Sequence, residues 1–152
     1  MSDDLLATAR RLAKASANKP RQADLKRAVS TAYYALFHAM AKNAADMVVG
    51  TGANRAEKAW AQVYRGMDHG FAKNACKEVV KLGFPTGIVI CADEFVTLQD
   101  ARHSADYDPL HRVTRADALT WVSRAEAAIK ALRGCSVKDR RAFAVQVLLK
   151  KR

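Results

Sequence analysis

The chain has 152 residues, half of them apolar, and its 26 Lys and Arg against 15 Asp and Glu give a formal net charge of +11. This length is typical of one domain with a core of its own, and the apolar content excludes an intrinsically disordered chain. No apolar run reaches the roughly 18 residues of a membrane span, and the first residues lack the pattern of a signal peptide. We therefore expect a cytoplasmic protein that does not associate with membranes and whose positive charge favours RNA or a nucleotide as partner.

Gly and Pro are scarce whereas Ala, Lys and Arg are abundant, a composition that favours helix over sheet. The first predicted helix covers residues 3–17 and ends before Pro20, which cannot continue a helix. The second covers residues 24–49 and contains neither Gly nor Pro. Its apolar residues extend nearly all round the helix, as is typical of a helix buried among neighbours. We place it at the centre of a bundle.

The rest of the chain is predicted to wrap around this central helix. Further helices are predicted at 55–65, 71–82, 88–106 and 115–134, and a last amphipathic helix in the tail from 136 onward. Thr114-Arg-Ala-Asp117 has the spacing of a capping box and marks one of these helix starts. We predict an all-α fold, an up-and-down bundle of four to six helices. Residues 1–134 form the helical domain, and 135–152 form a basic helix or tail that packs on it or extends it.

The sequence contains no recognised motif for a metal, a cofactor or a nucleophilic cysteine. Cys76, Cys91 and Cys135 are odd in number and widely spaced, which indicates buried free thiols rather than a disulfide framework or a zinc site. There is no phosphate-binding loop, no His-Glu-x-x-His and no Cys-x-x-Cys. The four histidines are scattered along the chain. We therefore expect no metal and no cofactor.

One segment of the 88–106 helix, Ala101-Arg-His-Ser-Ala-Asp-Tyr-Asp-Pro109, has the composition of a binding site. Arg102 follows Leu98 by one helical turn, so its cation is expected on or beside the buried face. Asp106 is one further turn along, at the spacing of a helix-face ion pair. Two interpretations remain open. Arg102 and Asp106 either hold helices together, with Tyr34 or His38 as neighbours, or form a site for a phosphate.

Two blocks of sequence resemble a known family. The first, in the central helix, reads Arg27-Ala-Val-Ser-Thr-Ala-Tyr-Tyr-Ala-Leu-Phe-His38 and is similar to the second-helix signature of small prokaryotic HEPN domain proteins. The second reads Arg102-His-Ser-Ala-Asp-Tyr107 and resembles their later Arg-x-x-Ala-Asp-Tyr signature. The blocks occur in the right order, and the resemblance covers roughly residues 3–133, which leaves the basic tail outside it.

The resemblance implies a helical bundle that forms homodimers with the motif helices facing a shared cleft. Many relatives are metal-independent endoribonucleases of toxin-antitoxin or defence systems, and some pair with a nucleotidyltransferase-like protein. Their catalytic motif is Arg, four to six residues, then His, whereas this sequence has Tyr107, Asp108 and Pro109 at those positions. The candidate residues on these grounds are, for catalysis, Arg102, His103, Asp106 and Tyr107, and for substrate binding, Arg27, Tyr34 and His38.

RNA cleavage without a metal requires three chemical tasks: deprotonation of the ribose 2′-hydroxyl, protonation of the leaving oxygen and neutralisation of the phosphorane. Arg102 is suited to the third task through a bidentate phosphate contact. A histidine near its ordinary pKa of about 6.5 is suited to proton transfer, whereas a tyrosine near 10 is a poor base at neutral pH. The main hypothesis is therefore a ribonuclease or RNA binder. The alternatives are a non-catalytic interaction module with a nucleotidyltransferase-like partner and, more weakly, a helix-turn-helix DNA-binding protein.

Overall fold

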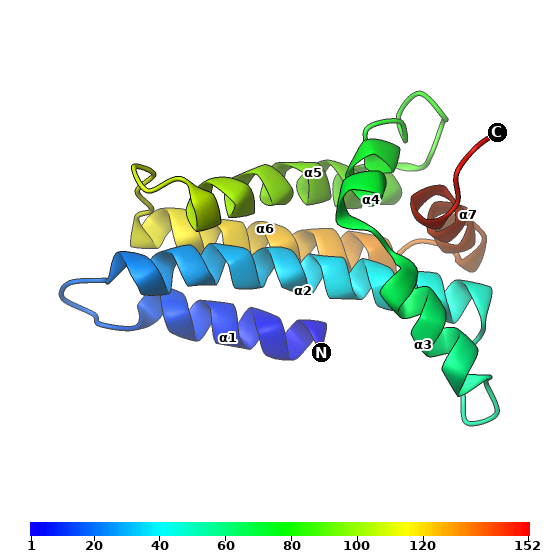
Figure 1. Cartoon of the computed structure of the whole chain (residues 1–152), viewed down its shortest axis with the longest axis horizontal. Coiled ribbons are helices and arrows are strands. Elements are labelled where there is room, and N and C mark those ends of the chain that lie inside the picture. The colour runs from blue at the N-terminus through cyan, green and yellow to red at the C-terminus, as the bar shows by residue number, and fades with distance from the viewer.

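The computed structural model describes all residues, 1–152, and consists of helices joined by short connections (Figure 1). The all-α class and the helical bundle are therefore confirmed, with seven helices in place of the four to six expected. The helices are α1 (Ser2–Lys14), α2 (Gln22–Val48), α3 (Glu57–Gly66), α4 (His69–Cys76), α5 (Thr86–Tyr107), α6 (Arg115–Arg133) and α7 (Val137–Leu148). No helix has the length and hydropathy needed to cross a membrane.

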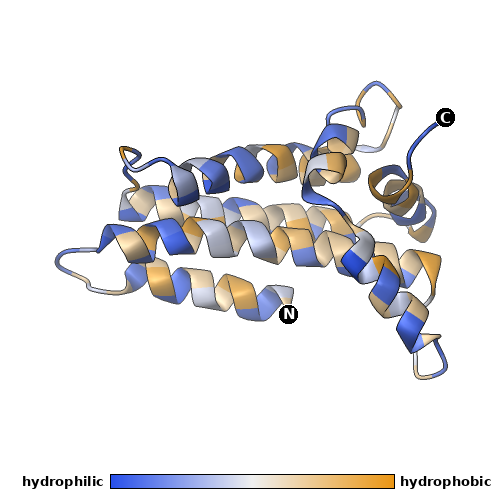
Figure 2. Cartoon of the chain, in the orientation of Figure 1, coloured by the Kyte–Doolittle hydropathy of each residue, from blue (hydrophilic) through white to orange (hydrophobic).

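The central position of α2 follows from its composition. Its 27 residues include a run of buried side chains that faces neighbours on every side, and α1, α3, α5, α6 and α7 all pack against it (Figure 1). Ala28, Ala32 and Ala35 are fully buried, so neighbouring helices approach its backbone closely. By contrast, α1 alternates hydrophilic and hydrophobic patches along its length, as expected of a helix with one buried face (Figure 2).

The segment predicted as one helix over 71–82 differs in the structure. Asp68 accepts a hydrogen bond from the backbone N–H of Phe71 at 2.7 Å and starts α4 at His69. Helix α4 then ends at Cys76. Beyond it, the backbone N–H groups of Glu78 and Val79 donate to carbonyls three residues back instead of four. The prediction of helix as far as residue 82 is therefore wrong. Gly83 closes the turns with a φ of +76°, a conformation that few other residues adopt.

The tail helix α7 shares the main core of the bundle. Its side chains Phe143, Ala144 and Val147 are buried, and they pack where α7 meets α2 and α4. Ser136 caps the helix by accepting a hydrogen bond from the backbone N–H of Asp139 at 3.1 Å. Only a short turn therefore separates the end of α6 from the start of α7, and the two helix ends lie together beside α2 (Figure 1).

Candidate functional site

Helix α5 presents Arg102 to α2, as the helical spacing predicts. The side chain is 16% exposed, and Leu98 one turn earlier is fully buried. Arg102 Nη1 donates a hydrogen bond to the hydroxyl of Tyr34 at 3.0 Å. The guanidinium carbon also lies 5.2 Å from the ring centroid of Tyr33 and 5.6 Å from that of Tyr34, within the range of a cation–π interaction. The cation is thus held on an aromatic surface rather than in bulk solvent.

The guanidinium of Arg102 keeps most of its hydrogen-bonding capacity free. Asp106 Oδ2 lies 3.7 Å from Nη1, beyond hydrogen-bonding distance. The hydroxyl of Ser30 donates a hydrogen bond to Oδ1 of the same carboxylate and so anchors it to α2. Arg102 Nε is buried and has no hydrogen-bond partner at all. Of the five N–H donors of an arginine, only one is therefore used within the protein.

Arg102 borders an open surface pocket of about 350 Å³. The pocket is lined by Lys73, Gln99, Asp100, Arg102, His103 and Ser104. Lys73 forms an ion pair with Asp100 across it, and Gln99 Oε1 is buried without a hydrogen-bond partner. A pocket with polar walls and the cations of Arg102 and Lys73 is suited to a polar, anionic ligand rather than to an apolar one.

The remaining predicted site residues divide into two groups. Tyr107 is 65% exposed and lies beside the site, with its ring centroid 6.0 Å from the guanidinium of Arg102 and 4.9 Å from the ring of His103. His38 instead donates to or accepts from the hydroxyl of Tyr64 through Nδ1 at 2.6 Å, and it lines a different pocket. Arg27 is exposed and makes no hydrogen bond or ion pair. The structure thus gathers the α5 residues and Tyr34. His38 lies at the edge of this group, with its ring centroid 6.5 Å from that of Tyr34, and Arg27 lies outside it.

A histidine that the sequence did not single out lies beside Arg102. His69, at the start of α4, shares a hydrogen bond of 2.6 Å between its Nδ1 and the hydroxyl of Tyr33. Its ring stacks on Phe37 at a centroid distance of 3.9 Å and meets the ring of Tyr34 edge-on at 6.1 Å. Arg102 and His69 therefore contact the same pair of tyrosines on α2.

The environment of His69 favours the neutral imidazole. Burial lowers the pKa of His69 below its ordinary value of 6.5, and the positive charge of Arg102 lowers it further. Nε2 of His69 makes no hydrogen bond. It is also not one of the two buried side-chain atoms that lack a partner, which are Gln99 Oε1 and Arg102 Nε. Nε2 is therefore not fully buried. No motif spacing relates His69 to Arg102, so only the tertiary fold reveals this proximity.

The lowered pKa of His69 predicts how stability depends on pH. The unfolded chain binds a proton near pH 6.5, whereas the folded protein does so only at lower pH. Stability is then fully retained above this value and falls as the pH drops from about 6.5 toward the folded pKa. His38, whose pKa is lowered by burial and by the amino terminus, acts in the same direction.

Urea unfolding between pH 8 and pH 5 measures this effect. We expect His69→Gln to lose less stability over this range than the wild type does. His103→Gln, which removes an exposed imidazole, serves as the matched control. An unchanged pH dependence in His69→Gln would contradict the assignment of a half-buried neutral imidazole.

The cysteines do not provide a nucleophile. All three are free, and Cys76 and Cys91 are buried. Burial raises the pKa of Cys76 to about 12 and that of Cys91 well above its ordinary value. Because the thiolate is the reactive form, neither sulfur is suited to covalent catalysis near neutral pH. No group of three or more His, Cys, Asp or Glu side chains is arranged to hold a metal ion.

Comparison with known proteins assigns neither a family nor a function to the chain. No protein-family model matches the chain, and no curated protein and no solved structure matches it.

Proposed function

We propose that this chain is a HEPN-type protein that binds RNA through Arg102. The observation that supports the proposal is the state of the guanidinium, which is held against Tyr33 and Tyr34 with four of its five donors unused. Arg102 and Asp106 form an ion pair, but it uses none of those donors in a hydrogen bond, because Ser30 binds this carboxylate and Arg102 Nη1 remains 3.7 Å from it. A role in holding helices together therefore accounts for only part of the hydrogen-bonding capacity of Arg102, and a phosphate contact accounts for more of it.

A phosphate group can bind the terminal nitrogens of Arg102, whereas the buried Nε is out of its reach. Two phosphate oxygens accept two parallel hydrogen bonds from one guanidinium, and such charge-assisted bonds are about twice as strong as neutral ones. The net charge of +11 attracts the strand over longer distances. Phosphate contacts of this kind carry no sequence information, so the proposal predicts RNA binding with little sequence preference.

The position of His69 extends the proposal to metal-independent cleavage. In the tautomer in which Nδ1 carries the hydrogen and donates it to the Tyr33 hydroxyl, Nε2 of the neutral imidazole is suited to accept the proton of a ribose 2′-hydroxyl, while Arg102 neutralises the phosphorane. His69 would then take the role of the histidine that the motif lacks after Arg102. His103 borders the same pocket as Arg102 and is the competing candidate for a proton-transfer group.

A cleavage assay in the presence of a chelator separates these two histidines. We expect the purified wild type to cleave a single-stranded oligoribonucleotide and His69→Ala to lose activity by about 100-fold or more, the range of general acid–base catalysis. His103→Ala is the matched control and should retain most of the activity. Equal activity of His69→Ala and the wild type would remove His69 from the mechanism, and loss in His103→Ala alone would transfer the role to His103.

Binding is tested separately from cleavage by fluorescence anisotropy with a labelled oligoribonucleotide. We expect the affinity to fall as salt is raised, because binding to phosphates releases counterions. A DNA strand of the same sequence tests whether the 2′-hydroxyl contributes. Absence of RNA binding at low salt would overturn the proposal, whatever the outcome of the cleavage assay.

A second candidate function is that of a non-catalytic interaction module. It is favoured by the exposed apolar residues that follow the site, since Tyr107 is 65% exposed and Leu110 is 87% exposed. Such residues are suited to a protein partner, either a second copy of this chain or a nucleotidyltransferase-like protein. Leu110→Asp combined with light scattering tests the homodimer. RNA cleavage by the purified chain would exclude the non-catalytic form.

A further inference from the structure

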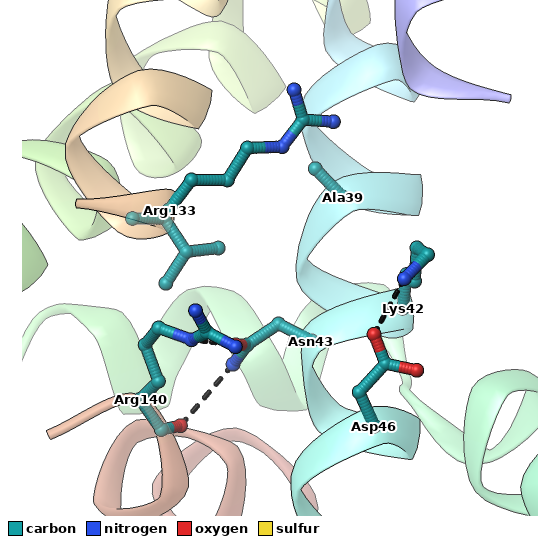
Figure 3. Close-up of a pocket in the computed structure, with 7 residues that line it drawn as sticks. Ala39, Lys42, Asn43, Asp46, Arg133 and Arg140 are labelled. Carbon is teal, nitrogen blue, oxygen red and sulfur yellow. Dashed lines mark hydrogen bonds and ion pairs between the residues drawn. The ribbon is translucent and has the colours of Figure 1, made fainter. Parts of the chain in front are cut away.

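A second pocket, of about 220 Å³, lies where α2, α6 and α7 meet (Figure 3). It is lined by Ala39, Lys42, Asn43, Asp46, Leu132, Arg133 and Arg140. Arg133 extends from the end of α6 and Arg140 from α7, and both side chains reach toward α2 (Figure 3). The lining therefore holds three cationic side chains and one carboxylate. Liquid water occupies about 30 Å³ per molecule, so the pocket has room for a phosphate group or a pyrophosphate.

Arg140 is fixed in this pocket without a carboxylate partner. Its Nε donates a hydrogen bond to Asn43 Oδ1 at 3.2 Å, and Asn43 Nδ2 donates to the backbone carbonyl of Arg140, also at 3.2 Å (Figure 3). Asn43 is 9% exposed, so a buried amide is committed to holding one arginine. The guanidinium makes one further, weak hydrogen bond, from Nη2 to the sulfur of Met47 at 4.0 Å. The terminal nitrogens are thus positioned but not neutralised.

The single carboxylate of the pocket is already occupied by other groups. Asp46 is 10% exposed, forms an ion pair with Lys42 and accepts a hydrogen bond from Trp60 Nε1 at 2.9 Å. Arg55 Nη1 lies 3.9 Å from the same carboxylate. Asp46 is therefore not available to Arg140. Arg133 pairs only with Asp3, and this contact is at the surface, with side chains 52% and 76% exposed, so it is weak.

We propose that this pocket is a phosphate-binding site, with Arg140 as its fixed donor and Arg133 and Lys42 as its flanking charges. A phosphate group satisfies the free terminal nitrogens of Arg140 and replaces the weak contact of Arg133 with Asp3. The site depends on α7, since Arg140 reaches it only because Ser136 caps this helix directly after α6. The phosphate belongs either to a small phosphate ester or to the backbone of an RNA strand.

The pocket is independent of the Arg102 site. Asn43 follows Tyr34 by nine residues, which places it on the opposite side of α2, about 180° round the helix axis and about 13 Å along it. The two sites therefore contact different faces of the central helix. A substitution in one site leaves the other site intact. The phosphate-site proposal can therefore be tested separately from the function proposed for Arg102.

Calorimetric titration with inorganic pyrophosphate at low salt tests the site. We expect the wild type to bind and Arg140→Gln to weaken binding by about tenfold or more. Arg141→Gln is the matched control, because it removes the same charge one residue along α7, where the side chain is exposed and donates only to the backbone carbonyl of Met47. It should change the affinity by less than about threefold.

The proposal is overturned if the wild type binds no pyrophosphate, if Arg140→Gln and Arg141→Gln weaken binding equally, or if only Arg102→Ala weakens it. Circular dichroism establishes that each variant is folded. Should Arg140→Gln fail to fold, Arg133→Gln decides, and it too should weaken binding by about tenfold relative to Arg141→Gln.

The same variants identify the source of the phosphate. If Arg140→Gln also weakens binding of a labelled oligoribonucleotide, and pyrophosphate displaces this strand, the site binds an RNA backbone. If strand binding is unaffected by Arg140→Gln and by pyrophosphate, the site binds a small phosphate ester. Either result supports a phosphate site at Arg140.

Discussion

Arg102→Ala is expected to weaken binding of single-stranded RNA by about 30- to 150-fold, measured by fluorescence anisotropy at low salt. Hydrogen bonds to charged groups contribute about 1.5–3 kcal/mol, and a bidentate phosphate contact lies toward the upper end of this range. Some loss of stability is also expected, because the side chain is only 16% exposed and its guanidinium contacts the rings of Tyr33 and Tyr34 besides making one hydrogen bond. A large loss of RNA binding in a variant that remains folded is therefore the expected signature.

Two variants provide the controls for this result. Arg11→Ala removes an exposed charge from α1, which packs on α2 and α6, and should reduce affinity by only a small factor. Arg102→Lys keeps the charge but loses the planar fork of donors, so it should restore only part of the affinity. If Arg102→Ala instead melts at a much lower temperature and binds RNA normally, Arg102 is a structural residue and the site assignment is wrong.

Phe95→Ala is expected to cause the largest loss of stability, about 3–5 kcal/mol in the free energy of unfolding. Phe95 is fully buried on α5, and its ring stacks on Tyr33 at 5.5 Å and on Phe37 at 6.4 Å between centroids. Removal of the ring leaves a cavity under the two α2 residues that support Arg102 and His69. Urea unfolding measures the loss, with the slope of the transition showing whether unfolding remains two-state.

Phe95→Leu is the control, because it retains most of the apolar volume and should be clearly less destabilising than the alanine variant. Both variants keep every charged group of the site. A loss below about 1 kcal/mol in Phe95→Ala would mean that the surrounding helices collapse into the cavity. The packing of α5 against α2 would then be less rigid than the buried aromatic cluster indicates.

The central helix and the orientation of Arg102 could be predicted from local sequence alone. Helical periodicity relates residues one turn apart, so the apolar Leu98 indicated that Arg102 faces inward. In the structure Leu98 is fully buried on α5. The same rule placed Asp106 beside Arg102. It could not show that Ser30 on α2 binds this carboxylate, because that contact joins residues far apart in the chain. The free donors of Arg102, on which the proposed function depends, follow from this one tertiary contact.

Two further features depend on contacts that no spacing encodes. His69 approaches Arg102 only because α4 starts early, where Asp68 caps it, and then packs against α2. The phosphate pocket requires the turn that sets α7 against α2, which brings together Asn43 and Arg140 although they are 97 residues apart in the sequence. The sequence indicated a basic tail helix but not what its arginines would face.

The place of α7 in the bundle has a consequence for how the protein is made. Its buried Phe143 and Val147 complete the core beside α2 and α4, yet they leave the ribosome after every helix that they contact. Folding during synthesis can join α1, α2, α5 and α6 first, while the apolar surface beneath α7 stays uncovered. A nascent chain paused before residue 137 should therefore recruit chaperones that release it once translation is finished.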